Sequence, residues 1–414
     1  MKKVLFTVAL MFGAFAASAQ QSVVKEAKGL MKKDPTAAAQ KIEAALTNPE
    51  TANDPNTWQL AGDIQKAIYD AENDINYMVQ AGIEKNKTAN LPKMFNSLLK
   101  MFDYYMKCDE VEQAKVASGE LKKAKLRNKN VDALLQRRPN LAYGGSEAFG
   151  ANDYVAATKF FGTYVDVVES PMFEAKVVEL KADTLYPLYA TYAAMSASLS
   201  EPKNLDAIIK YGAIGKADKK EGWKGLLYMS EAYKEKGDTI KWLDTVKEGV
   251  SLFPEIQQFI GGLMDYYLSK GMIEEALAEI DKQLAVGKTP FLLHVKSVLL
   301  NEKRDYEGAM AVADEIIAMG GEFQAEAYAM KGNCYYNPAQ LLLLENNELS
   351  LEDPKYNANL AKIKDAYAKA MPFYEQAQKL APQNTALWGN PLLRIYYDLN
   401  KATEYDILSK ELGY

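Results

Sequence analysis

The chain has 414 residues, of which 48% are hydrophobic and 25% charged, and this composition is typical of a soluble globular protein rather than a disordered or collagen-like chain. Its formal net charge of -6 disfavours nucleic acid as a partner. The single histidine, His294, excludes zinc sites built on several imidazoles, and no metal or other cofactor is expected.

The first nineteen residues have the pattern of a secretory signal peptide. A pair of lysines opens the chain, an apolar run follows over residues 4–16, and Ala17-Ser18-Ala19 offers the small residues that a signal peptidase accepts. The apolar run is short for a membrane span, and no cysteine for a lipid anchor follows it. We therefore expect cleavage between Ala19 and Gln20 and a periplasmic or secreted protein.

Beyond the signal peptide, apolar residues recur at intervals of three and four, and runs with a period of two are missing. Short polar breaks divide roughly seventeen amphipathic segments, which predicts helical hairpins packed side by side. Residues 20–138 are expected to form an irregular helical region, in which only Trp58 and Gly62 fit a hairpin motif. No segment after residue 20 is apolar enough to predict a membrane span.

A repeat of 34 residues organises residues 139–414. The clearest match is between two sets of three residues that lie 34 positions apart: Tyr233, Gly237 and Trp242, and then Tyr267, Gly271 and Ala276. Prolines close second helices at Pro254 and Pro382. This pattern resembles the tetratricopeptide repeat (TPR) family, in a secreted Gram-negative bacterial form. The resemblance implies an all-α, right-handed α-solenoid of tetratricopeptide-like helical hairpins.

Small and aromatic residues have a steric role in this pattern. Gly332 in a first helix, and Ala276 and its counterparts in second helices, are expected to allow close helix contact, with aromatic rings filling the space between hairpins. Four pairs of tyrosines are expected to place one ring between helices and the other outward or toward the groove, with packing of both rings as the alternative: Tyr104-Tyr105, Tyr266-Tyr267, Tyr335-Tyr336 and Tyr396-Tyr397. Tyr336 is the member expected to be an exposed anchor for a partner, and Tyr335 the packing residue.

The repeat is interrupted after Asn337-Pro338. A second helix is expected only from about residue 359, so that residues 337–358 form an insertion. This insertion has two interpretations, a passive excursion that folds over the end of the array or a segment added for function.

The resemblance implies a non-catalytic scaffold that binds a peptide or protein partner in the cell envelope along the concave face of the first helices. In the 34-residue register the predicted binding residues on that face are Lys224, Glu231, Lys234, Asp265, His294, Asn301, Asn333 and Tyr336. A glycan-binding envelope protein is the alternative, because one outer-membrane sugar-uptake family is built on the same repeats. An enzyme is disfavoured, because His294 lies in an apolar helix start without a nucleophile elbow, and no catalytic residue is assigned.

Two further features concern modification. The tripeptide Asp-Thr-apolar, which resembles an acceptor for bacterial O-glycosylation, places candidate sites at Thr184, Thr239 and Thr245, although Asp238 is also an ordinary helix cap. Cys108 and Cys334 lie 226 residues apart and are expected to be free, buried thiols rather than a disulfide.

Overall fold

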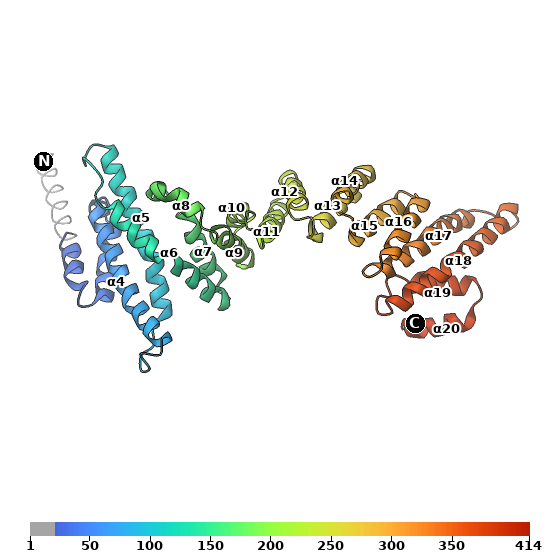
Figure 1. Cartoon of the computed structure of the whole chain (residues 1–414), viewed down its shortest axis with the longest axis horizontal. Coiled ribbons are helices and arrows are strands. Elements are labelled where there is room, and N and C mark those ends of the chain that lie inside the picture. Colours follow the sequence, from blue (N-terminus) through green and yellow to red (C-terminus); the bar gives the residue numbers. More distant parts are fainter. Residues whose placement is uncertain (1–20) are drawn as a thin grey trace, which may run out of the picture. The chain divides into compact units, whose positions relative to one another are not determined.

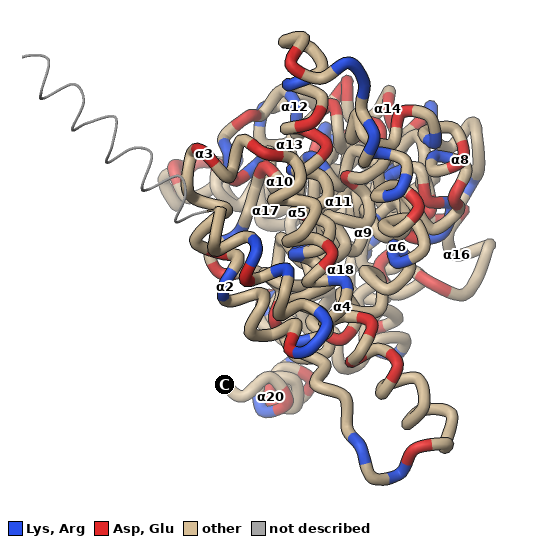
Figure 2. Tube along the Cα trace, turned by 90° about the vertical axis from the view of Figure 1, so that its left-hand side faces the viewer, with Lys and Arg blue, Asp and Glu red and all other residues tan. Residues whose placement is uncertain are grey.

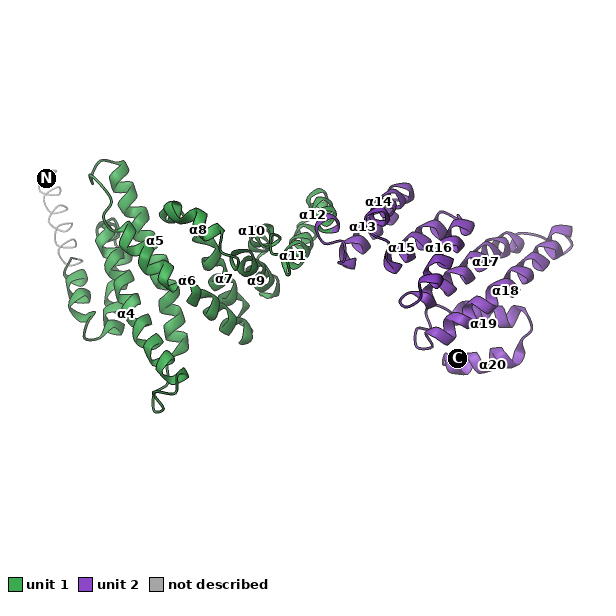
Figure 3. Cartoon of the chain, viewed as in Figure 1, with its two compact units in different colours: residues 1–249 green, residues 250–414 purple. Residues whose placement is uncertain are grey.

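The computed structural model describes residues 21–414, which form helices and turns without a strand (Figure 1). The predicted signal peptide, residues 1–19, lies outside the described residues, as does Gln20 after its predicted cleavage site. The all-α solenoid of helical hairpins predicted from the sequence is confirmed. The chain divides into two compact units, the first up to Gly249 and the second from Val250 onward (Figure 3).

Unit 1 begins with a helical segment over residues 21–30 and continues with paired helices. Their bounds are α2 (Pro35–Thr47), α3 (Pro49–Ala52), α4 (Pro55–Gln80), α5 (Leu91–Ala117), α6 (Arg127–Gly150), α7 (Tyr154–Asp166), the 3-10 helix η1 (Pro171–Lys176), α8 (Val177–Lys181), α9 (Tyr186–Leu199), α10 (Leu205–Gly215), α11 (Gly222–Glu235) and α12 (Thr239–Leu252), in which the boundary falls. Close pairs include α4 with α5, α6 with α7, and α9 with α10, while α9 also contacts α7 and α11.

Unit 2 repeats the same arrangement of neighbouring helices. Its helices are α13 (Gln257–Ser269), α14 (Ile273–Val286), α15 (Pro290–Glu302), α16 (Tyr306–Met319), α17 (Gln324–Asn347), α18 (Pro354–Leu380), α19 (Gly389–Asp398) and α20 (Ala402–Glu411).

Local sequence explains where the second helices start and the first helices stop. Asp153 and Asp305 cap α7 and α16, because each carboxylate accepts a hydrogen bond from a backbone N–H in the first turn, at 3.0 and 2.9 Å. Gly237 and Gly271 follow α11 and α13 with φ values of 72° and 69°, a conformation that favours glycine after a helix.

Aromatic rings pack directly against glycines of the neighbouring helix and so set the distance between the two helices of a hairpin, as the sequence predicted for Gly332. A Cβ atom on Gly332 would lie 2.9 Å from the ring of Tyr374, and one on Gly145 would lie 2.6 Å from the ring of Phe161. Since real Cβ contacts do not come this close, a larger residue at these positions would push the helices apart.

Two predicted boundaries are wrong for the same physical reason. The division expected at 138/139 falls inside α6, and the insertion expected over 337–358 is the end of α17, a short turn and the start of α18. Pro139 and Pro338 both lie within continuous helices. A proline in a helix interior costs about 3 kcal/mol, and burial of the residues that follow it, among them Leu141 in α6 and Ala339 in α17, offsets this cost.

Candidate functional site

The predicted binding row is divided between the two units. Its first three members, Lys224, Glu231 and Lys234, lie on α11 in unit 1. The other five lie in unit 2: Asp265 on α13, His294 and Asn301 on α15, and Asn333 and Tyr336 on α17. The two parts of the row are therefore described separately, each within its own unit.

On α11 the predicted residues form an open polar surface. The ammonium of Lys224 pairs with Glu221 and lies 5.4 Å from the ring centre of Trp223. The hydrogen bond that Lys224 donates to the Glu221 carboxylate raises the pKa of Lys224. Glu231 and Lys234 are exposed, so this part of the row is accessible to a partner.

In unit 2 the predicted asparagines are engaged within the fold. Asn333 accepts a hydrogen bond of 2.6 Å from the hydroxyl of Tyr374, and Asn301 accepts one of 3.2 Å from the side chain of Asn337. Asp265 is exposed. These two asparagines therefore have a packing role in addition to any contact with a partner.

Tyr335 packs as predicted, whereas the exposed position predicted for Tyr336 is wrong. Tyr336 is half-buried, with its ring stacked on Tyr367 at 5.4 Å and edge-on to Tyr374 at 6.1 Å. Burial raises its pKa to about 12. Tyr335 is also half-buried and stacks on Phe373 at 6.0 Å. Because α17 continues past Pro338, both rings face a neighbouring helix instead of opening into a loop.

The other tyrosine pairs follow the predicted division more closely. Tyr105, Tyr267 and Tyr396 are buried, while Tyr397 is well exposed. Tyr104 and Tyr266 are intermediate between these extremes. The pattern of one packed ring and one more accessible ring therefore applies to three of the four pairs.

His294 is half-buried, as expected for a structural histidine. Its ring stacks on Phe323 at 5.1 Å, and its Nδ1 atom is buried without a hydrogen-bond partner among residues 21–414. Burial lowers the pKa of His294, an effect that Glu326 partly opposes. The neutral imidazole is thus the form that this environment favours.

A groove in unit 1 was not predicted from the sequence. It has a volume of about 890 Å³ and is lined by α7, by residues 200–204 and by the start of α10. Val155 contributes an exposed apolar side chain, and Tyr211 contributes a buried ring whose hydroxyl donates a 3.0 Å hydrogen bond to Asp166. The groove lies along second helices, whereas the predicted row lies on first helices.

Lysines at the edge of this groove pair with acids on neighbouring helices and turns. Lys159 pairs with Asp103 at 3.2 Å, Lys236 pairs with Asp206 at 2.8 Å, and Lys203 pairs with Glu235. These pairs raise the pKa of Lys203 and lower that of Asp206. Exposed pairs of this kind add little stability, so a partner's charges can replace either member. Along the chain, basic and acidic residues are interspersed in the same way (Figure 2).

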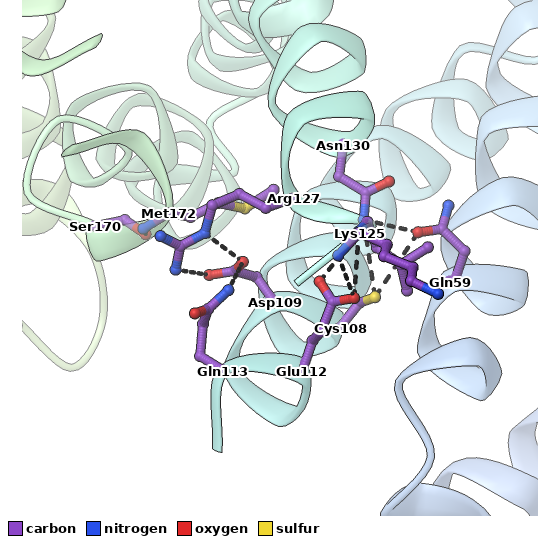
Figure 4. Close-up of polar contacts among 11 residues, drawn as sticks. Gln59, Cys108, Asp109, Glu112, Gln113, Lys125, Arg127, Asn130, Ser170 and Met172 are labelled. Atoms are coloured by element: carbon purple, nitrogen blue, oxygen red, sulfur yellow. Dashed lines mark hydrogen bonds and ion pairs between the residues drawn. The ribbon is translucent and has the colours of Figure 1, made fainter. Parts of the chain in front are cut away.

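Carboxylates on α5 hold the chain that enters α6 (Figure 4). Asp109 receives two hydrogen bonds from Arg127, at 2.7 and 2.8 Å. Glu112 accepts from the backbone N–H groups of Lys125 and Leu126, at 2.8 and 3.1 Å. Because these donors and acceptors satisfy one another, the hydrogen bonds of Asp109 and Glu112 hold the start of α6 against α5 and do not form a binding site.

Both cysteines are free and buried, as expected. The Cys108 thiol donates a 3.2 Å hydrogen bond to the Pro55 carbonyl and lies beside Asn130, whose amide donates to Gln59 (Figure 4). Burial raises the pKa of Cys108 and of Cys334 to about 12. Both thiols are therefore protonated at neutral pH and are poor nucleophiles.

The three candidate glycosylation sites differ in accessibility. Thr184 and Thr239 are exposed. Thr245 is buried, and its hydroxyl donates a 2.7 Å hydrogen bond to the Lys241 carbonyl, so its assignment as a modification site is wrong for the folded protein. Asp238 accepts from the Lys241 N–H at 3.1 Å, which is the ordinary capping role.

The described part of the chain offers neither a metal site nor a membrane-spanning helix. Residues 21–414 contain no group of three or more His, Cys, Asp or Glu side chains placed to hold a metal ion. None of the described helices has the length and hydropathy needed to cross a membrane.

Comparisons with known proteins leave the family open. No family model and no curated protein sequence matches this chain. Similar solved structures include a TPR repeats protein from Bacteroides fragilis, at 17% identity over 63% of this chain and 98% of that chain, with a TM-score of 0.33. Yeast Tom70 is similar at 12% identity over 95% of this chain and 91% of that chain, with a TM-score of 0.29. At these values the likeness carries no argument about function.

Proposed function

We propose that this protein is an exported, non-catalytic scaffold that binds a peptide or protein partner in the cell envelope. The observation that carries the proposal is the groove of about 890 Å³ along α7 and α10, with its edge of exchangeable charged pairs. A groove of this size and openness suits an extended segment of a partner, whose own charges can replace one member of each pair.

The chemistry of the described residues agrees with a binding role. The two thiols are protonated at neutral pH, and the imidazole of His294 is stacked on Phe323 in a half-buried site. Neither arrangement supplies an activated nucleophile with a base beside it. Export is the part of the proposal that depends on the pattern of residues 1–19.

Charge reversal at the groove tests the binding role. The partner is first captured by crosslinking in the native envelope and then purified, so that its affinity for each variant can be measured. We expect the double variant Lys159→Glu, Lys203→Glu to bind at least about tenfold more weakly. Lys282→Glu is the matched control, because this lysine is exposed on α14 in unit 2 and should leave the affinity unchanged.

Two results would contradict the proposal. Equal affinity of all three proteins would place the partner elsewhere, and the variants Glu231→Lys and Lys234→Glu on α11 would then test the predicted row. Binding to a glycan array, with no protein captured from the envelope, would favour the glycan-binding alternative. Export is tested separately by the intact mass of protein from envelope fractions, which should begin at Gln20.

A further inference from the structure

Arg138 on α6 is bonded differently from the other arginines of this helix. Arg127 donates through Nε and Nη2 to Asp109, at 2.7 and 2.8 Å, and Arg137 donates through Nε and Nη2 to Asp70, at 3.0 and 2.6 Å. Arg138 is 6% exposed, and its Nη2 atom is buried without a hydrogen-bond partner among residues 21–414. A buried guanidinium with an open N–H pair is costly unless something accepts from it.

The remaining contacts of Arg138 hold the guanidinium in place. Its Nε donates to the backbone carbonyl of Tyr164 at 3.0 Å, and its Nη1 donates to Asp183 Oδ2 at 2.8 Å. The guanidinium carbon lies 3.7 Å from the ring centre of Tyr164, whose hydroxyl donates to the same Asp183 oxygen at 2.6 Å. The group is therefore preorganised by α7 and by the turn before α9.

Asp183 is ionised and balances the charge of Arg138. Burial would raise the pKa of Asp183, but hydrogen bonds from Tyr164, from the Leu185 N–H and from Arg138 together lower it. Arg138 and Asp183 line a cavity in unit 1, and among the other described residues that line this cavity Glu179 is the one with a charged side chain. An anionic ligand would thus meet no net positive charge here.

The cavity, of about 380 Å³, lies beside this pair and is lined mostly by apolar groups. Leu135, Ala142, Leu180 and Leu185 form its walls, together with Pro139 and the ring of Tyr189. Arg138 is part of this lining and its Nη2 atom is buried, so an occupant that accepts from Nη2 must displace a neighbouring side chain. Leu185 also belongs to the lining and is 43% exposed, so its apolar surface is accessible to an occupant.

We propose that this cavity binds an uncharged peptide unit, with an apolar side chain against the leucines and the adjoining backbone carbonyl accepting from Nη2 of Arg138. The apolar lining selects the side chain, the open N–H pair selects the acceptor, and the balanced charges disfavour a carboxylate. The peptide as the natural source of this unit rests on the proposed function, whereas the binding chemistry does not.

The test uses N-acetyl-leucinamide as the probe and the folded full chain, labelled at its five arginines for nuclear magnetic resonance. We expect saturable shifts at the Arg138 guanidinium, and weaker shifts with N-acetyl-leucine, which carries a carboxylate. Leu185→Ala should weaken binding about fivefold through lost apolar contact. Leu199→Ala, at an equally exposed leucine of α9 outside the cavity, should leave it unchanged.

A substitution at the arginine itself gives a second measurement. Arg138→Lys keeps a cation for Asp183 but removes the open N–H pair, and should weaken probe binding about tenfold. Absence of a saturable Arg138 shift, equal binding by wild type and Leu185→Ala, or tighter binding of the carboxylate probe would each overturn the proposal. Because no partner protein is present, such a failure is separate from a failure of the scaffold function.

Discussion

The ring of Tyr105 on α5 occupies the space that a Cβ atom on Gly62 of α4 would need, since that added carbon would lie 2.3 Å from the ring. The Tyr105 hydroxyl also donates a 2.7 Å hydrogen bond to Asp63 Oδ1. The ring and the hydroxyl together fix the distance between α4 and α5 at this point, and burial strongly raises the pKa of Tyr105.

Replacing Gly62 with alanine should therefore destabilise unit 1. The added methyl group must displace the Tyr105 ring, at a cost of about 1–3 kcal/mol in the free energy of unfolding. Gly29 is the matched control, because it is helical and a Cβ atom there would meet nothing within 4 Å among the described residues. Gly29→Ala should be neutral or stabilising, and urea unfolding of both variants measures the difference.

A second overpacking test concerns α14. Ala276 is fully buried, whereas Ala278 on the same helix is exposed. Ala276→Leu should lower the free energy of unfolding by about 1–3 kcal/mol, and Ala278→Leu should change it by less than about 0.5 kcal/mol. Glu279 on the same helix is a poor control, because its side chain is only 20% exposed and accepts a hydrogen bond from Gln283.

Truncation of Tyr336 should lower stability, contrary to its predicted role as an exposed anchor. Tyr336→Ala removes the ring contacts with Tyr367 and Tyr374, and we expect a loss of about 2–3 kcal/mol. Tyr397→Ala, at the exposed member of another pair, should cost less than about 1 kcal/mol. Equal melting temperatures for the two variants would contradict this packing role of Tyr336.

The stability of the protein should fall on mild acidification because of His294. Its pKa is lowered in the folded state, so the unfolded chain binds the proton more readily at a pH just below the ordinary value of 6.5. Protonation of His294 therefore lowers the free energy of unfolding as the pH falls through 6.5 toward the folded-state pKa. At higher pH the imidazole is neutral in both states, and His294 has no such effect. His294→Phe keeps an aromatic ring against Phe323 and removes the titration. The difference in melting temperature between wild type and this variant should change across this range and be constant above about pH 7.5.

The sequence predicted those features that depend on local spacing. The small residue Gly332 is found under a neighbouring ring, and Ala276 is fully buried, because the 34-residue period carries this information directly. The continuity of α17 through Pro338 was not predictable in this way, because the compensating contacts come from a separate helix, α18.

The groove and the Arg138 cavity were also missed, for a related reason. Each combines side chains from several helices and from the turns between them, such as Arg138 on α6 with Asp183 before α9. The one local signal for the groove was the polar break at Glu201-Pro202-Lys203, which supplies part of its lining. A pattern within single helices cannot show which turns meet.

The buried thiols supply a native reporter for each unit. Cys108 lies in unit 1 and Cys334 in unit 2, and both stay protonated and shielded from alkylating reagents while the fold is closed. Each becomes reactive only when the helices around it open, so the labelling rate of each cysteine measures the opening free energy of its own unit. Mass spectrometry of the two cysteine peptides after a timed pulse of iodoacetamide would then rank the two units by stability without introducing any probe into the chain.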